Sequence, residues 1–304
     1  IEYVRNKYGI RKIAVVDTDC HHGDGTQDIY WHDPNVLYIS VHQDGRTLYP
    51  GTGFPDEFGG PNALGANVNI PLPPRTSDEG FLYVLDHLIR PILDEFQPDL
   101  IVNSAGQDNH YTDPITDMRF SAQGYARLND GLAPHIAVLE GGYSIEDALP
   151  YVNVGIILAM AGLPYDHVRE PDFDPAVIKQ PTEISRYIEK LVGQIRRQWD
   201  NRSAMKEKIT GSAKFLKRNK DIYYDTDDIR EQQTETVRIC NDCGGLVTID
   251  SRADPGRRIF AVIIPASSCP ACRREGEDIF DKTDKGPYQN VYFQDRDRNI
   301  YAAK

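Results

Sequence analysis

Long apolar runs and positive charge are both scarce in this sequence, and each shortage excludes or disfavours certain classes of protein. No apolar run is long enough to cross a membrane or to form the hydrophobic region of a secretory signal. Lys and Arg number 34 against 46 Asp and Glu, which gives a formal net charge of -12 at pH 7. The negative net charge disfavours nucleic acid as a partner and weakly favours cationic partners such as lysine-rich tails or polyamines.

Cysteine is scarce as well, and its arrangement argues against a secreted protein. The chain has five cysteines, an odd number, and four of them form two C-x-x-C pairs. We therefore expect a reducing, cytoplasmic compartment. An initiator methionine is absent: the chain starts at Ile1, and IEYVRNKYGI resembles the end of an amphipathic helix, so we expect a fragment of a longer protein.

The length and the hydrophobic pattern indicate two domains, the larger of them of the α/β class. With 304 residues and 40% hydrophobic composition, the chain is able to form one large core and a smaller appendage. Short β-branched runs alternate with helical patterns at about 77–96 and 144–162, which predicts a parallel sheet buried on both faces. A long Gly- and Pro-rich segment at 43–66 is predicted to be a functional rim loop. The four predicted strands are IAVV at 13–16, VLYISV at 36–41, DLIVNSA at 99–105 and HIAVLEG at 135–141.

A cluster of polar residues follows each of these four runs, at the edge of the sheet where ligands collect. After the first run, DTDCHHGDG places Asp17, Asp19 and His21 two residues apart, so that all three could face one side of the sheet edge. Two oxygens and a nitrogen form half a metal site, and Asp108 in SAGQDNH is the expected further ligand, with His110 in reserve. From this stretch alone, ordinary turn residues remain an alternative.

Five motifs in order resemble one known family. DTDCHHGDGTQDIYW, ISVHQDGRTLYPGTG, NVNIPLPP, SAGQDNHYTDP and LEGGY are similar to motifs of the zinc-dependent histone deacetylase and acetylpolyamine amidohydrolase family. The resemblance covers about residues 1–163. It implies an arginase/deacetylase-type α/β fold whose N-terminal part is missing here, with an incomplete sheet and an exposed edge.

The resemblance also implies a catalytic centre. Asp19, His21 and Asp108 match the ligands of the catalytic Zn²⁺, and Tyr143 matches the tyrosine that stabilises the oxyanion of the substrate. The implied reaction is hydrolysis of a linear amide by zinc-activated water. Tyr49 matches an aromatic wall of the acyl-lysine channel.

Two further features follow from the same resemblance. Asp17, Ser40 and Val41 match a site for a structural K⁺, to which Asp19 and His21 add contacts. The family's general base and acid are a pair of adjacent histidines that precede the first strand seen here, so we expect the base outside this chain segment. His22 is expected to be structural and cannot replace that base.

The resemblance ends near residue 164, and we expect a partial catalytic domain at 1–164, a connector at 165–235 and a small domain at 236–304. The connector contains a predicted helix with Ile184, Ile188, Leu191 and Ile195 at helical spacing. This helix is expected to pack on the catalytic domain. The polar stretch from 201 to 235 is predicted to be a linker with marginal helices.

The last segment contains the pattern of a β zinc ribbon. Two C-x-x-C pairs enclose the strand-like LVTID and RRIFAVIIP, and NVYFQDRDRNIYAAK is a predicted hairpin. Four thiolates would close a tetrahedral structural Zn²⁺ site. An unmetallated thiol cluster or a redox pair remains an alternative, although a redox motif is expected between a strand and a helix. The four cysteines are Cys240, Cys243, Cys269 and Cys272.

Two classes of function remain. The first is a zinc amidohydrolase that removes acetyl or related acyl groups from lysine side chains or polyamines, with the ribbon as a module for a protein partner. The second is a non-catalytic protein that binds acylated amines and uses the ribbon as a scaffold. A manganese ureohydrolase of the arginase type is disfavoured by the spacing from Asp17 to His21. The substrate, the acyl group and the choice of zinc or iron stay open.

Overall fold

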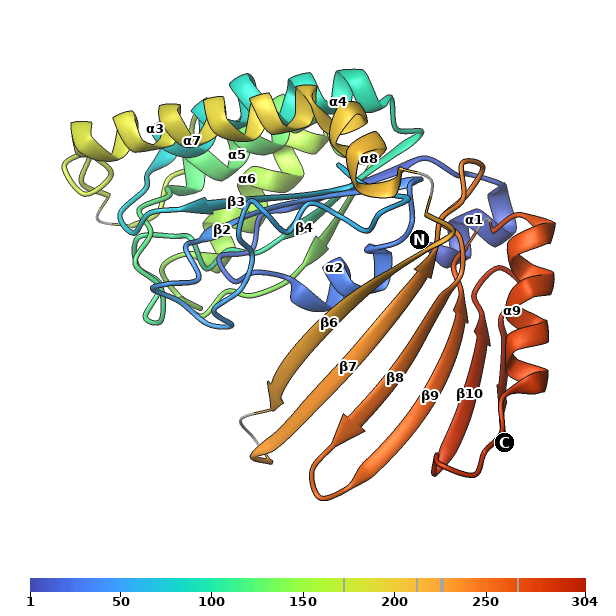
Figure 1. Ribbon diagram of the computed structural model, residues 1–304. Helices are drawn as coiled ribbons and strands as arrows, with labels where there is room; N and C mark the ends of the chain where they lie inside the picture. Colours follow the sequence, from blue (N-terminus) through green and yellow to red (C-terminus); the bar gives the residue numbers. More distant parts are fainter. Residues whose placement is uncertain (172, 212, 225–226, 267) are drawn as a thin grey trace. The chain divides into compact units, whose positions relative to one another are not determined.

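The computed structural model describes residues 1–171, 173–211, 213–224, 227–266 and 268–304. These residues form two compact units, which are coloured along the chain in Figure 1. The first unit consists of Ile1–Trp31, Asn35–Gly59 and Gly65–Arg202. The second consists of His32–Pro34, Gly60–Leu64 and Ser203–Lys304. Two short segments of the N-terminal half therefore belong to the second unit.

The first unit contains a five-stranded sheet in which every pairing is parallel, in the order β3-β2-β1-β4-β5. All four predicted strands are present, and the sequence analysis missed β3, where Asn67 and Asn69 interrupt the apolar pattern. The central strands β1 and β2 are buried along their whole length. The strands are β1 (Ile13–Asp17), β2 (Val36–Gln43), β3 (Asn67–Leu72), β4 (Leu100–Ala105) and β5 (Ile136–Leu139).

Strand β5 lies at one edge of this sheet, and its apolar side chains are exposed. Leu139 is 71% exposed and Ile136 is 40% exposed, whereas Ile13 and Val36 in β1 and β2 are completely buried. An edge strand presents unpaired backbone groups, and here it also presents uncovered apolar side chains. The exposed edge expected from the sequence is therefore present at β5.

Helices α3, α4 and α7 lie on one side of this sheet (Figure 1). The helix predicted at 77–96 forms as α3, a π-helical turn η1 and α4, and the predicted helix at 144–162 begins later, as α6. Helix α7 packs on α3, η1 and β3, which confirms the predicted packing. Among the described residues, no helix has the length and apolar character needed to cross a membrane. The helices are α1 (Glu2–Tyr8), α2 (Asp24–Tyr30), α3 (Asp78–Val84), η1 (Leu85–Ile89), α4 (Arg90–Phe96), α5 (Ala122–Leu132), α6 (Leu149–Met160) and α7 (Thr182–Asp200).

The second unit contains a six-stranded sheet in the order β11-β10-β9-β8-β7-β6. Its neighbouring strands are antiparallel, except that β10 pairs in parallel with β9 after helix α9 has crossed over between them. Leu246, Val262, Ile264 and Phe293 form its core, against which Ile279 and Phe280 of α9 pack. The elements are α8 (Arg202–Thr210), β6 (Phe215–Tyr224), β7 (Ile229–Arg238), β8 (Val247–Ala253), β9 (Arg257–Ile264), α9 (Pro270–Lys282), β10 (Asn290–Asp295) and β11 (Ile300–Ala303).

The sequence analysis was right about three parts of this unit and wrong about two. The strands predicted as LVTID and RRIFAVIIP form as β8 and β9, and the terminal hairpin forms as β10 and β11. The predicted linker at 201–235 is instead α8 followed by the long hairpin of β6 and β7. Polar residues on both faces of β6 and β7 concealed them, because these strands extend an existing sheet and bury little themselves. Helix α9 was also missed.

Candidate active site

The loops that follow the parallel strands β1, β4 and β5 meet at one edge of the first unit's sheet. Asp17, the last residue of β1, pairs in register with Ser40 of β2 and Ser104 of β4. The loop after β1 is joined to the loop after β4, because the Cys20 N–H donates to Asp108 Oδ1 over 2.8 Å. The sheet topology therefore brings together the polar clusters that the sequence places at the strand ends.

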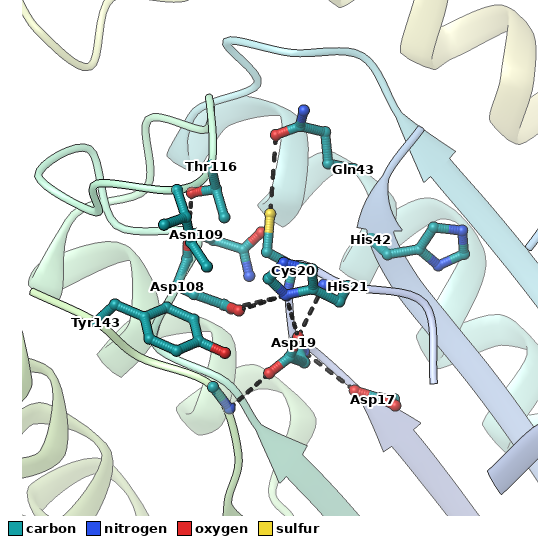
Figure 2. A network of polar contacts seen from close by, with 12 residues as sticks. Asp17, Asp19, Cys20, His21, His42, Gln43, Asp108, Asn109, Thr116 and Tyr143 are labelled. Atoms are coloured by element: carbon teal, nitrogen blue, oxygen red, sulfur yellow. Dashed lines mark hydrogen bonds and ion pairs between the residues drawn. The ribbon is translucent and has the colours of Figure 1, made fainter. Parts of the chain in front are cut away.

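Asp19, His21 and Asp108 offer ligand atoms that all lie within 4.8 Å of one another. His21 Nδ1 lies 3.2 Å from Asp19 Oδ1 and 2.9 Å from Asp108 Oδ2 (Figure 2). Asp17 does not join this group. Its Oδ1 accepts the Asp19 N–H and its Oδ2 accepts the Tyr38 hydroxyl. The expectation that three residues of DTDCHHGDG face one site is therefore correct for two of them.

The electrostatics of this group favour a positive charge between the two carboxylates. Hydrogen bonds to Asp108 and Asp19 raise the pKa of His21 to about 10. Burial raises the pKa of Asp108 to about 6. Burial acts in the same direction on Asp19, but hydrogen bonds from His21 and Gly141 outweigh it and lower its pKa. A divalent cation would satisfy both carboxylates and leave the imidazole neutral, so the donor set fits a metal ion.

Glycines allow this close approach. The Gly141 N–H donates to Asp19 Oδ2 over 2.7 Å, and a Cβ at Gly141 would lie 2.5 Å from Asp108 Oδ2. A Cβ at Gly106 would lie 2.4 Å from the Cα of Asp19. Side chains at either position would push the ligands apart. The sequence analysis identified the EGGY turn through its tyrosine and missed the part played by Gly141.

Tyr143 stands beside the three ligands and points its hydroxyl toward the carboxylates of Asp19 and Asp108 (Figure 2). Its ring lies edge-on to His21, with 6.4 Å between ring centroids, and its side chain is 48% exposed. Burial and then the negative charges of Asp108 and Asp19 raise the pKa of the phenol, which therefore stays protonated at neutral pH. The Tyr143 N–H donates to Asp113 Oδ2 over 2.9 Å, a contact that the sequence analysis missed.

The residues predicted for K⁺ are buried, Asp17 at the end of β1 and Ser40 and Val41 within β2. The Tyr38 hydroxyl donates to Asp17 over 2.7 Å, and burial raises the pKa of Asp17 to about 7. Ser40 Oγ lies 2.8 Å from His42 Nδ1, and Val41 is 1% exposed. Asp17 pairs in register with Ser40, and the role of the three residues in K⁺ binding stays a prediction.

His22 and Cys20 occupy structural positions in this region. Both ring nitrogens of His22 have partners, since Nδ1 lies 2.8 Å from Thr52 Oγ1 and Nε2 lies 3.1 Å from Gln27 Oε1. Cys20 is completely buried, with Gln43 Oε1 3.9 Å from its sulfur. These contacts agree with the structural role expected for His22.

His110, which the sequence analysis held in reserve as a metal ligand, does not face the three ligands. Its Nδ1 lies 2.8 Å from Thr112 Oγ1 and its Nε2 lies 3.3 Å from Glu170 Oε1. Its ring nitrogens are held by these partners and are not among the ligand atoms that lie within 4.8 Å of one another, so we correct that expectation. Tyr49 lies on the loop between β2 and β3 and is 73% exposed, and its place in an acyl channel stays a prediction.

A second group of potential metal ligands lies in the second unit. The sulfurs of the four C-x-x-C cysteines all lie within 4.8 Å of one another. This group was predicted from the sequence as a structural zinc site. Its convergence is compatible with a zinc ribbon.

The comparisons with known proteins agree with this description. The family model for the histone deacetylase domain matches residues 1–155, just over half of the chain. The chain therefore belongs to the histone deacetylase family, as the five motifs predicted.

Curated relatives and solved structures agree with this family assignment. A protein named "Probable deacetylase" from Archaeoglobus fulgidus is 52% identical over 177 residues, which cover 55% of this chain and 48% of that protein. The "Histone deacetylase-like amidohydrolase" of Pseudomonas aeruginosa is 33% identical over 195 residues, covering 61% of this chain and 50% of that protein. The crystal structure of the HDA15 HD domain has a TM-score of 0.55 and 26% identity, with 69% of this chain and 57% of that chain covered. The chain spans about half the length of the curated relatives it matches.

Proposed function

We propose that the first unit carries the metal-binding and carbonyl-binding part of an amidohydrolase site that removes acyl groups from lysine side chains or polyamines. The observation that carries the proposal is the convergence of Asp19, His21, Asp108 and Tyr143 at one sheet edge. The names of the relatives, a deacetylase and an amidohydrolase, support this class of reaction. The net charge of -12 supports a cationic substrate.

The metal would be held by one oxygen of Asp19, Nδ1 of His21 and one oxygen of Asp108. Two carboxylates and one imidazole suit Zn²⁺, and three protein ligands leave a position open for water or substrate. When bound, the ion supplies a Lewis acid that polarises an acyl carbonyl and lowers the pKa of water. Asp19 is held in place by the Gly141 N–H, and Asp108 by the Cys20 N–H.

Tyr143 would donate a hydrogen bond to the carbonyl oxygen of the scissile amide. Because negative charge develops on that oxygen in the transition state, the bond strengthens as the reaction proceeds. The raised pKa of Tyr143 keeps the proton on the donor. Asp113 acts as a positioning residue, since it binds the backbone N–H of Tyr143.

Two further roles complete the proposal. Asp17, Ser40 and Val41 would hold K⁺, and a cation there would stabilise the ionised form of the buried Asp17. Tyr49 would line the entrance used by the acylated amine.

We assign the proton-accepting role to neither His21 nor His22. The sequence contains one adjacent pair of histidines, His21 and His22. His21 belongs to the metal group, and both nitrogens of His22 contact side chains, those of Thr52 and Gln27. The same observation supports a second candidate, a protein that binds acylated amines at this site without hydrolysing them.

Mass spectrometry of an acetyl-lysine peptide incubated with the Zn²⁺-loaded chain tests the proposal, with N-acetylputrescine as the polyamine counterpart. We expect Zn²⁺-dependent binding of the peptide that weakens in Tyr143→Phe while zinc content stays unchanged, and any turnover should fall about 10²- to 10³-fold in that variant, as for loss of an oxyanion donor. Metal-dependent peptide binding without acetate release would favour the binding protein. If the metal-loaded chain neither binds nor hydrolyses the peptide, both candidates are contradicted.

A further inference from the structure

We propose that the second unit holds one structural Zn²⁺, and that Asn62 and Arg238 complete this site. The metal would be bound by four thiolates and would make the segment Gly60–Leu64 part of the second unit. This inference does not depend on the proposed amidohydrolase activity. The four thiolate ligands are Cys240, Cys243, Cys269 and Cys272.

The distances between the sulfurs match tetrahedral coordination. Cys240 Sγ lies 3.9 Å from Cys269 Sγ, and Cys243 Sγ lies 3.6 Å from Cys272 Sγ. Four sulfurs at the usual Zn–S distance of about 2.3 Å in a tetrahedron are about 3.8 Å apart. A disulfide would require about 2.05 Å. Each of these two distances joins a cysteine of one C-x-x-C motif to a cysteine of the other, as expected when both motifs bind one ion.

The first C-x-x-C motif has the backbone of a metal-binding turn. The Gly245 N–H donates to Cys243 Sγ over 3.3 Å, a contact that stabilises a thiolate. Gly245 has φ +82°, and its Cβ would lie 2.1 Å from the Arg238 carbonyl oxygen. A Cβ at Gly244 would lie 2.3 Å from the carbonyl oxygen of His32, which belongs to the same unit. Both glycines after Cys243 are therefore required by close packing.

Arg238 supplies a positive charge beside the sulfurs. One Zn²⁺ with four thiolates carries a net charge of about -2. Arg238 Nη1 donates to Cys272 Sγ over 3.0 Å, and its Nε donates to Glu275 Oε2 over 2.6 Å. The Arg238 side chain is only 18% exposed. A cation held at this depth, in contact with a ligand sulfur, fits an anionic cluster better than four neutral thiols.

Asn62, from a distant part of the sequence, holds the first motif in place through hydrogen bonds of its side chain. Its side chain is buried, and its Oδ1 accepts the Cys240 N–H over 3.0 Å. Its Nδ2 donates to the carbonyl oxygens of Arg238 and Gly244, each over 2.8 Å. One amide therefore fixes the residues before and after the first two ligands. Loading of the metal should in turn order the segment that carries Asn62.

The second C-x-x-C motif has features that sequence reasoning assigned to a redox pair. Cys269 is the N-cap residue of α9 and Pro270 is the first residue of that helix, so the motif begins between β9 and α9 and continues into the helix. Position alone therefore does not exclude redox chemistry. The convergence of all four sulfurs and the contact with Arg238 favour the metal site.

Metal analysis of the 304-residue chain tests the site, with the first unit's ligands removed by His21→Ala and Asp108→Asn. We expect this variant to keep one equivalent of zinc per chain and to lose it when Cys272→Ser is added. Cys20→Ser is the matched control and should keep the zinc. Absence of zinc in the double variant, one equivalent of iron in its place, or retention of zinc in Cys272→Ser would overturn the assignment.

A spectrum of the Co²⁺-substituted double variant covers the case in which Cys272→Ser fails to fold. Tetrahedral thiolate coordination predicts intense thiolate-to-cobalt charge-transfer bands, and their absence would overturn the proposal. For Asn62, we expect Asn62→Ala to speed transfer of zinc to a chromophoric chelator about tenfold or more, while Asn219→Ala leaves the rate unchanged. Equal rates in the two variants would remove Asn62 from the site.

Discussion

The two units present opposite kinds of potential metal site. The first unit gathers two carboxylates and one imidazole, with His21 21% exposed and Tyr143 standing beside it. The second unit gathers four thiols, with Cys243 and Cys272 buried. Three mixed ligands leave a coordination position open, whereas four thiolates close the site. A cluster of metal-binding side chains alone therefore does not tell a catalytic site from a structural one. The type of donor atoms and the groups around them make that distinction.

The surroundings differ in the same sense. Around the first site, negative charge accumulates, and the nearby Tyr143 is a hydrogen-bond donor whose hydroxyl points toward the carboxylates. Around the second, Arg238 and the Gly245 N–H both face the sulfurs and offset their charge. The first arrangement is suited to receive a ligand, and the second is suited to keep an ion in place.

Removing zinc from the second site should have the largest effect. Metal binding to a small thiolate site contributes directly to folding, so Cys243→Ser or chelation should unfold much of the second unit. Hydrogen exchange followed by mass spectrometry should show amides of β8 and β9 losing protection by several orders of magnitude, while β1 and β2 keep theirs. Protection of β8 and β9 that survives complete removal of zinc would break the comparison.

Gly141→Ala should affect the first site alone. The added Cβ would lie 2.5 Å from Asp108 Oδ2, so the two carboxylates have to move apart. We expect the affinity of the first site for Zn²⁺ to fall at least tenfold by calorimetric titration, with the second site still loaded. Gly25→Ala is the control, because a Cβ there meets nothing within 4 Å. Equal affinity in the two variants would show that the glycine is not required.

Asp113→Asn should have a smaller effect that sharpens the role of Tyr143. The variant keeps the shape of the side chain and weakens the bond from the Tyr143 N–H to the carboxylate. We expect the Zn²⁺-dependent affinity for an acetyl-lysine peptide, and any turnover of it, to fall about tenfold or less, with zinc content unchanged. A positioning role further requires that the same change have no additional effect in a Tyr143→Phe background. Additive losses in the double variant would contradict it.

Glu95→Gln should have the smallest effect and should concern only the first unit. A hydrogen bond from Trp199 and the charge of Arg196 lower the pKa of Glu95, which links α4 to α7. A carboxyl whose folded-state pKa is lowered stabilises the fold above its unfolded pKa of about 4.5, and loses this contribution as pH falls below it. Because the side chain is 38% exposed, we expect a loss of less than about 1 kcal/mol at pH 7 and less still at pH 3, from denaturant unfolding. A loss that grows toward pH 3 would have the wrong sign.

Sequence patterns predicted most of what is local in this molecule. The apolar run of β1 and the two-residue spacing of Asp19 and His21 located the strand and half of the first site. The polar cluster after the third predicted strand supplied Asp108, and the family resemblance then supplied the role of Tyr143; both residues lie on other loops. The spacing of the cysteines predicted the second cluster directly.

Contacts between distant segments were not predictable in the same way. Gly141 and Asp113 act through backbone hydrogen bonds that leave no periodic signal. Asn62 lies 178 residues before Cys240, in a loop that the sequence assigned to the rim of the sheet. The hairpin of β6 and β7 was missed because its residues are polar and its stability comes from pairing with β8.

The most direct test of the central claim counts metal ions in matched variants of the 304-residue chain. The chain itself should bind two equivalents of zinc, whereas Asp108→Asn and Cys272→Ser should each bind one. Only the equivalent left in Asp108→Asn should show thiolate-to-metal charge transfer after exchange for Co²⁺. Loss of the same equivalent in both variants, or of neither, would contradict the account of two sites of different kind.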